Sequence, residues 1–196
     1  MFVRTFHSIH NYLRCKSFAH ILLPYLHDYK SVLDVGTSTG ALAASMLISA
    51  PDLRLAGIDV VVGSQPLIPM VKGNGKRLPF EDNAFDCVMM IDVLHHDEHP
   101  GELLAEAKRV SRKRVLIKDH YWNSRFDHLV LSAQDYIGNK FYGIDLPYNF
   151  LQIDTWHTLF EDIGLNVVGD LNLRLNAFDL RKHVIFELEK PQTVIN

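Results

Sequence analysis

Cysteine is scarce in this chain, and long apolar runs are absent from it. The 196 residues include two cysteines, Cys15 and Cys87, which are too few for a disulfide framework and stand in no metal-ligand spacing. No stretch approaches the roughly 18 apolar residues of a membrane-spanning helix, and the N-terminus lacks the continuous apolar stretch of a signal peptide. These absences predict a reduced, cytoplasmic protein with no membrane span.

A strong charge of one sign is also absent. The formal net charge is -3, with no long Lys/Arg run, whereas phosphate binding usually needs a basic face. Only Arg109, Arg112, Lys113 and Arg114 begin to suggest a basic patch, and we interpret them as a helix end, where cations offset the helix dipole. We therefore expect a small-molecule partner rather than a nucleic acid.

Short β-rich runs alternate with helical periodicity along the whole chain, which predicts one α/β domain with a mostly parallel sheet covered on both faces. The expected strands are Ser31–Val35, Leu53–Ile58, a short one near Met70, Phe85–Ile91, Arg114–Lys118, and a last pair near Asn166–Leu173 and His183–Leu188. Because no helix is expected between the last two strands, they are predicted to form an antiparallel hairpin added to the parallel sheet.

Helical stripes fall between most of these strands. They are expected around Phe18–Tyr25, around Ala43–Ala50, after Pro100, over Phe126–Ile137 with Gly138 as the closing residue, and from a capping Asp154 to Gly164. Pro66 and Pro69 forbid a regular helix after the second strand, so a loop or extended segment is expected there.

A glycine turn between the first strand and the helical stripe around Ala43–Ala50 carries the strongest functional signal. Asp34 precedes the turn, whose glycines, Gly36 and Gly40, have the spacing GxxxG rather than the GxGxxG of a dinucleotide site. A carboxylate beside this turn suits a ligand with a cationic α-amino group, such as S-adenosylmethionine. Asp59, at the end of the second strand, is placed to accept hydrogen bonds from two ribose hydroxyls.

Three segments make the chain resemble a class I S-adenosylmethionine-dependent methyltransferase of the type 11 group. They are Val32–Gly40 (VLDVGTSTG), Leu78–Val88 (LPFEDNAFDCV) and the run from Asp92 through His96 to Arg109-Val110. The resemblance implies a Rossmann-like three-layer sandwich with a seven-stranded sheet of order 3-2-1-4-5-7-6, strand 7 antiparallel. It divides the single domain into an N-terminal helical segment (1–30), a cofactor-binding core (31–120), a substrate-covering segment (121–165) and a terminal hairpin (166–196).

The same resemblance assigns the cofactor site. Gly36 and Gly40 would frame the methionine end of the cofactor, Asp59 would hold the ribose, and the amide of Asn74 would meet the adenine amino group. The full set of expected cofactor-binding residues is Asp34, Gly36, Thr37, Ser38, Gly40, Asp59, Val60, Asn74, Gly75 and Ile91.

The sequence departs from the family pattern at three places. Ser38 replaces the middle glycine of the turn and would be strained by a positive φ. The helix after the second strand is missing or reduced, and Ser111-Arg112-Lys113-Arg114 replaces the usual KPGG turn. These departures bear on cofactor affinity more than on the fold.

Candidate catalytic residues follow strands 4 and 5 of the predicted sheet. Asp119 beside His120 would set the tautomer of a general base, although Asp119 as a helix cap and His120 as a packing residue is the alternative. His96 is the further candidate: one of His95 and His96 is expected to touch the cofactor or substrate and the other to pack against the sheet. Asp92 would reach the pocket or cap the following turn, and a structural role is favoured for all three. No metal site is expected, because His95, His96 and His99 match no reliable ligand spacing.

Aromatic residues crowd the segment that would cover the acceptor. They are Tyr121, Trp122, Phe126, Tyr136, Phe141, Tyr142, Tyr148 and Phe150. Some are expected to line a pocket for an aromatic, apolar or lipid-like small molecule, and most to be core.

Three other functions remain open at this point. Ser38 and Asn74 would suit a cofactor-binding module of the same fold without catalytic activity. An NAD-dependent oxidoreductase is disfavoured by the GxxxG spacing and the terminal hairpin, and nucleic-acid methylation by the missing basic face. The leading hypothesis is methyl transfer from S-adenosylmethionine to a small molecule.

Overall fold

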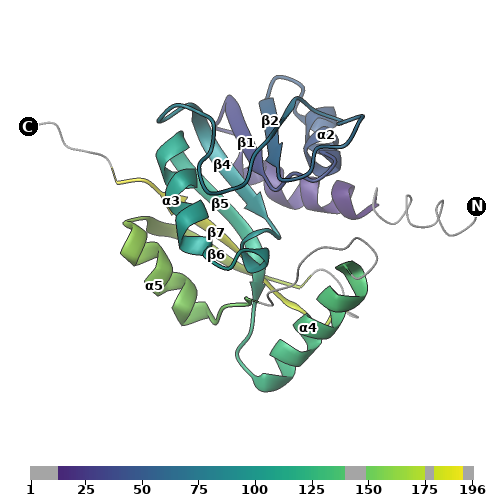
Figure 1. Cartoon of the computed structure of the whole chain (residues 1–196), viewed down its shortest axis with the longest axis vertical. Helices are drawn as coiled ribbons and strands as arrows, with labels where there is room; N and C mark the ends of the chain where they lie inside the picture. The colour runs from purple at the N-terminus through teal and green to yellow at the C-terminus, as the bar shows by residue number, and fades with distance from the viewer. Residues whose placement is uncertain (1–12, 140–148, 175–178, 192–196) are drawn as a thin grey trace, which may run out of the picture.

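A computed structural model describes residues 13–139, 149–174 and 179–191 of the chain (Figure 1). An N-terminal helix covers residues 13–22. The elements after it are η1 (Leu23–Tyr25), β1 (Ser31–Val35), α2 (Ala41–Ser49), β2 (Arg54–Asp59), β3 (Met70–Lys72), β4 (Phe85–Ile91), η2 (Leu94–His96), α3 (Pro100–Val110), β5 (Ser111–Tyr121), α4 (Arg125–Asn139), α5 (Ile153–Ile163), β6 (Asn166–Leu173) and β7 (Lys182–Glu189). Within the described ranges, no helix has the length and apolar character needed to cross a bilayer.

The strands form one seven-stranded sheet of order β3-β2-β1-β4-β5-β7-β6. β1 pairs in parallel with both β2 and β4, and β4 pairs in parallel with β5. β7 runs antiparallel to β5 on one side and to β6 on the other. The sequence-based prediction of a parallel sheet with an antiparallel terminal hairpin is therefore confirmed.

Two apolar layers hold helices against the opposite faces of this sheet. One layer joins Leu33 of β1 to Trp156 of α5, and the other joins Val32 to Leu22 and to Met46 of α2. Neighbouring strand residues alternate between the layers because successive side chains point to opposite faces. The result is the expected three-layer sandwich.

Three local predictions need correction. β5 extends from Ser111 to Tyr121, beyond the expected Arg114–Lys118, because it pairs with β7 as far as Tyr121 opposite Lys182. Asp154 does not cap α5; the N-cap is Gln152 and Asp154 lies in the first turn. Gly138 does not close α4, which continues to Asn139.

The segment between β2 and β3 contains no helix, as Pro66 and Pro69 predict. It runs beside the glycine turn, where the Leu67 N–H donates to the Thr39 carbonyl at 3.1 Å. Without a covering helix, Val60 and Val61 at its start are exposed.

Candidate active site

The turn between β1 and α2 requires glycine at both ends. Gly36 and Gly40 have φ of 74° and 79°, in the left-handed region that glycine adopts freely. A Cβ on Gly36 would lie 2.4 Å from the side chain of Val93, and one on Gly40 would lie 2.7 Å from that of Ile68. Larger residues are therefore excluded by backbone conformation and by space.

Ser38 also adopts the left-handed conformation, with φ of 54°. The strain that the sequence predicted for a positive φ is therefore present at this position. The Ser38 N–H donates to Asp59 Oδ2 at 2.7 Å, and the Val61 N–H donates to Oδ1 at 3.0 Å. Asp59 thus fastens the turn to the end of β2, and each of its oxygens keeps a lone pair for another donor.

A cavity of about 160 Å³ opens beside this turn. Of the expected cofactor-binding residues, those lining it are Asp34, Gly36, Thr37, Ser38 and Ile91. Asp34 is 3% exposed, and burial, with the Asp59 carboxylate adding to it, raises the pKa of Asp34 to about 7. A cationic ligand group would restore the charged carboxylate, so the residues present fit the α-amino group of S-adenosylmethionine.

The other five expected positions, Asp59 and the four described next, are not among the residues that line the cavity. Gly40 begins α2, and Val60 is exposed beside Asp59. Asn74 Oδ1 accepts from the Lys76 N–H at 3.2 Å, and Gly75 has φ of 76°. The amide of Asn74 therefore shapes its own loop and has one acceptor position left for a ligand.

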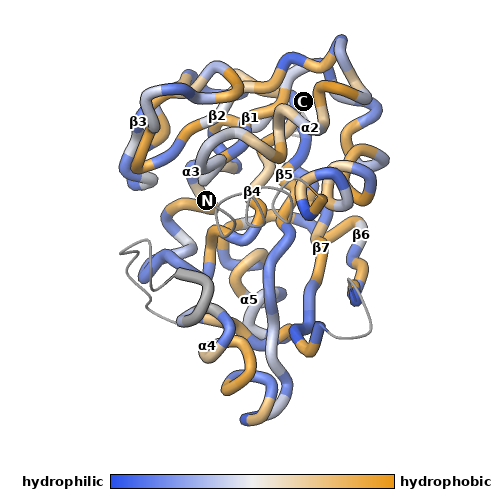
Figure 2. Tube along the Cα trace, turned by 90° about the vertical axis from the view of Figure 1, so that its right-hand side faces the viewer, coloured by the Kyte–Doolittle hydropathy of each residue, from blue (hydrophilic) through white to orange (hydrophobic). Residues whose placement is uncertain are grey.

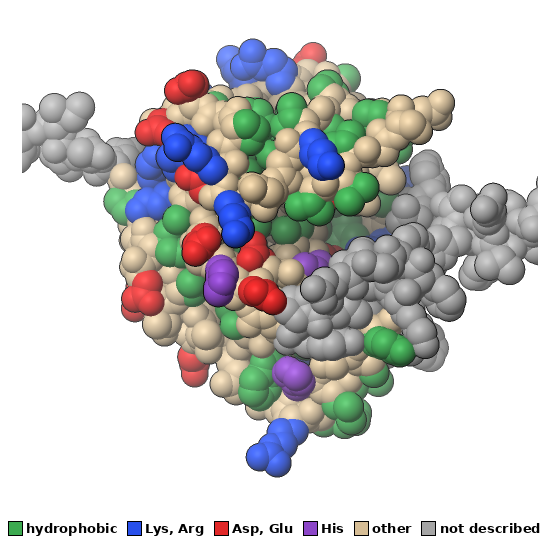
Figure 3. All heavy atoms as spheres, viewed as in Figure 1, with side chains coloured by type: hydrophobic (Ala, Val, Ile, Leu, Met, Phe, Trp, Pro, Cys, Tyr) green, Lys and Arg blue, Asp and Glu red, His purple; other side chains and the backbone are tan. Residues whose placement is uncertain are grey.

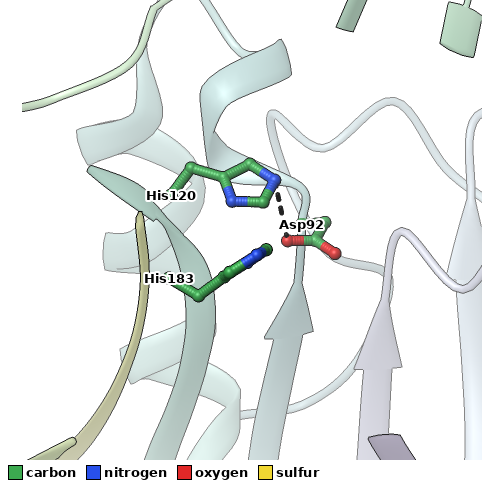
Figure 4. Close-up of side chains that lie close together, drawn as sticks. All are labelled: Asp92, His120 and His183. Carbon is green, nitrogen blue, oxygen red and sulfur yellow. Dashed lines mark ion pairs between the residues drawn. The ribbon is translucent and has the colours of Figure 1, made fainter. Parts of the chain in front are cut away.

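A buried cluster of titratable groups lies where β4 and β5 end, next to the cavity (Figure 4). Asp92 follows Ile91 and has φ of 57°, a strained conformation for a residue with a side chain. Its Oδ1 lies 2.5 Å from Lys118 Nζ and 3.6 Å from His120 Nε2. The ring of His183, opposite His120 on β7, lies 4.6 Å from the His120 ring.

Charge compensation sets the protonation of this cluster. Burial alone would raise the pKa of Asp92, but Lys118, then His120 and Arg14, hold it well below its usual value. Burial lowers the pKa of His120 well below its usual value against the opposing effect of Asp92. Burial, with Lys118 adding to it, lowers the pKa of His183 to about 4. Both imidazoles are therefore neutral near pH 7.

The expected side-chain pair of Asp119 with His120 does not form. Asp119 Oδ1 lies 2.6 Å from His95 Nδ1, and its Oδ2 accepts from the Leu94 N–H at 3.1 Å. Successive residues of β5 face opposite sides of the sheet, so Asp119 turns toward η2 while the ring of His120 meets Asp92. Asp119 is thus neither the partner of the His120 ring nor a cap of the next helix.

The other two histidines lie in η2. His95 is buried and stacks on Phe150, with ring centroids 5.1 Å apart. His96, the third candidate catalytic residue, is partly buried, and its ring centroid lies 4.1 Å from that of His95. The His95 ring therefore lies beside the cluster, with its centroid 5.4 Å from that of His120, and the His96 ring lies beside His95.

The aromatic segment divides into three parts. Phe150 is buried, and its carbonyl accepts from Trp122 Nε1 at 2.8 Å. Phe126 and Tyr136 of α4 are exposed, so these two are not among the rings that form the core. Phe141, Tyr142 and Tyr148 lie outside the described residues. In Figures 1 and 2 α4 extends away from the sheet, which agrees with these exposures.

Asp92, His120 and His183 also have the composition of a metal site. However, Lys118 already occupies Asp92 Oδ1, and Arg14 Nη2 lies 3.3 Å from Oδ2. A divalent cation would have to enter beside two positive charges and displace one of them. The contacts therefore favour a charge-paired cluster over a metal site.

The sequence of the chain is similar to that of a known protein family. Residues 33–117 match a family described as "Methyltransferase domain". This stretch therefore has the sequence of a methyltransferase domain, and together with the relatives below it supports S-adenosylmethionine-dependent methyl transfer by the chain. The matched residues run from β1 into β5, so the family match contains the glycine turn, Asp59 and the cluster residue Asp92.

Relatives of this methyltransferase share its fold along most of the chain. The ubiquinone/menaquinone biosynthesis C-methyltransferase of Burkholderia orbicola is 25% identical over 169 residues, covering 72% of this chain and 70% of the relative. A possible histamine N-methyltransferase from Thermotoga maritima has a TM-score of 0.64 at 17% identity, covering 96% of this chain and 97% of that one. Magnesium protoporphyrin IX methyltransferase from Synechocystis, solved with bound S-adenosylhomocysteine, has a TM-score of 0.63 at 15% identity, covering 97% and 88%.

Some site residues of this methyltransferase are missed by the sequence analysis. Arg14 enters the cavity from the N-terminal helix, and His183 enters the cluster from β7. Lys118 has a visible signal, since a lysine in the apolar run Val115–Lys118 needs a buried partner. Arg14 and His183 have none, because their positions depend on helix packing and on strand register.

Proposed function

We propose that this methyltransferase acts on a small-molecule acceptor whose nucleophilic hydroxyl or phenol is deprotonated by His120. S-Adenosylmethionine supplies an activated methyl group when bound. The chain contributes placement of the acceptor, exclusion of water and a base for the acceptor proton. The proposal rests on the position of His120, which is neutral and buried and faces Asp92. Asp92 directly follows Ile91, which lines the cavity.

The two nitrogens of His120 have different surroundings. Nε2 faces Asp92 Oδ1 at 3.6 Å, which favours the tautomer with its hydrogen on Nε2. Nδ1 is buried without a hydrogen-bond partner among the described residues. In that tautomer Nδ1 carries the lone pair that accepts the acceptor proton, and the Asp92 carboxylate stabilises the imidazolium that results.

The segment 121–165 is proposed to cover the acceptor. His120 is 6% exposed, so an acceptor reaches it only when part of this cover moves. Phe150 belongs to the segment and lies 6.3 Å from the His120 ring, centroid to centroid. An aromatic or apolar acceptor would replace such a ring contact without leaving polar groups unpaired.

Two relatives support an acceptor of this kind. The Burkholderia protein is described as acting in ubiquinone/menaquinone biosynthesis and the Synechocystis protein on magnesium protoporphyrin IX. Both names denote large, flat or lipid-like small molecules. The intermingled charges on the viewed face of the described residues (Figure 3) offer no basic field for a polyanion.

Labelled methyl transfer tests this proposal. Wild type would be assayed with phenol, quinol, amine and thiol acceptors alongside His120→Gln, with His27→Gln, at an exposed histidine after η1, as the control. We expect His120→Gln to lower kcat on a hydroxyl or phenol by about 10²–10⁴-fold, with S-adenosylhomocysteine affinity unchanged and the control near wild type. Unchanged turnover of His120→Gln on such an acceptor would contradict the role of His120. Cofactor binding without turnover on any acceptor would favour the binding-module alternative.

A further inference from the structure

The N-terminal helix (residues 13–22) forms one wall of the cofactor cavity. Arg14, Cys15 and Phe18 of this helix line the cavity together with the glycine turn. Among all the lining residues, Arg14 and Asp34 are the two charged ones, and they have opposite signs. A cavity with one cation and one carboxyl is suited to a zwitterion, such as the amino-acid end of the cofactor.

We propose that Arg14 binds the α-carboxylate of the cofactor's methionine group while Asp34 binds its α-amino group. This proposal rests on S-adenosylmethionine as the cofactor. A guanidinium presents two parallel N–H donors that match a carboxylate, which makes arginine the favoured residue for this task. Without Arg14, the carboxylate would enter a cavity whose only other charged lining residue among those described, Asp34, is acidic.

The Arg14 guanidinium can exchange its present contact with Asp92 for a contact with the cofactor carboxylate. Its side chain is 54% exposed, and its Nη2 lies 3.3 Å from Asp92 Oδ2, which is long for a charge-assisted hydrogen bond. Partly exposed pairs of this kind contribute little to stability. Asp92 keeps Lys118 at 2.5 Å when Arg14 leaves, so no buried carboxylate is left unpaired.

The ring of Phe18 supports the Arg14 guanidinium between Asp92 and the cavity. Its ring is 4% exposed and lies 5.6 Å below the guanidinium carbon of Arg14, one helical turn away. Lys118 Nζ lies 4.8 Å from the same ring. The Arg14 guanidinium can therefore move between Asp92 and the cavity while staying over one aromatic surface.

The alternative role for Arg14 is purely structural, as a tie between the helix and Asp92. The two roles predict different ligand dependence. A structural tie affects every ligand of the cavity alike, and Asp92→Asn should then mimic Arg14→Ala. A carboxylate contact affects only ligands that carry the amino-acid group.

Calorimetric titration with two ligands separates these roles. S-Adenosylhomocysteine carries the amino-acid group, and 5′-methylthioadenosine has the same adenosine and thioether without it. We expect Arg14→Ala to weaken S-adenosylhomocysteine binding by about 10- to 100-fold, the range of a hydrogen bond to a charged group, with 5′-methylthioadenosine binding unchanged. Arg14→Lys should weaken S-adenosylhomocysteine binding less.

Lys16→Ala is the matched control, because Lys16 is an exposed cation of the same helix outside the cavity lining. Equal losses for both ligands in Arg14→Ala, or no loss for either, would overturn the proposal while leaving the cofactor in place. Failure of wild type to bind S-adenosylhomocysteine would overturn the cofactor assignment and this proposal together. Circular dichroism and melting curves of both variants establish that they remain folded.

Discussion

Replacing Asp34 by Asn should stabilise the free protein and weaken cofactor binding at the same time. Burial raises the pKa of Asp34 from 3.8 to about 7, so ionisation is disfavoured in the folded state. The unfolded chain therefore releases this proton at lower pH than the folded chain, and stability falls as pH rises through this window. At about 1.36 kcal/mol per pKa unit, this roughly three-unit shift corresponds to roughly 4 kcal/mol of lost stability by pH 8. Asn has the same shape and cannot ionise.

Urea unfolding of wild type and Asp34→Asn at several pH values measures this effect. The difference in free energy of unfolding should be near zero at about pH 4, grow up to about pH 7, and then stay constant in favour of the variant. Titration with S-adenosylhomocysteine should show that the variant binds more weakly, because the α-amino group loses its carboxylate. A variant that is less stable than wild type at pH 8, or a difference independent of pH, would refute the reasoning.

Three other changes have expected outcomes. Ser38→Gly should raise the free energy of unfolding by about 1 kcal/mol by relieving the left-handed conformation, measured by urea titration; a loss of stability would contradict this. Lys118→Met should destabilise the protein by about 3 kcal/mol because it removes the nearest cation from Asp92 and leaves the longer Arg14 contact, and Asp92→Asn in the same chain should restore much of the loss; additive losses would refute the pairing. Because burial lowers the pKa of His120, kcat on a hydroxyl acceptor should stay level between about pH 8 and pH 6; a decline with a midpoint near the usual histidine pKa would contradict this.

The fold follows from patterns that are visible in the sequence. The apolar run of β4 indicates a buried strand, and the glycines after β1 indicate a tight turn. The terminal strands indicate a hairpin because no helix separates them. The extra length of β5 is not visible locally, because Lys118, Asp119 and His120 break the apolar pattern and are strand residues only through pairing with β7.

The sequence predicts those parts of the candidate site that depend on local turns and on the pairing of neighbouring strands. Asp34, Ser38 and Asp59 are close in the structure because the turn and the parallel pairing of β1 with β2 bring them together. The partner of His120 is not predictable from adjacency, since alternation along β5 turns Asp119 away from it. Contacts between distant segments, such as Arg14 with Asp92, require the packed structure.

Calorimetric titration of the purified chain with S-adenosylmethionine tests the central claim most directly. The account predicts micromolar binding by wild type, equivalent to about -8 kcal/mol, and its loss in Asp59→Ala, which removes the proposed ribose acceptor and the anchor of Ser38. A folded wild-type sample that binds neither S-adenosylmethionine nor S-adenosylhomocysteine would contradict the claim that this cavity holds the methyl donor.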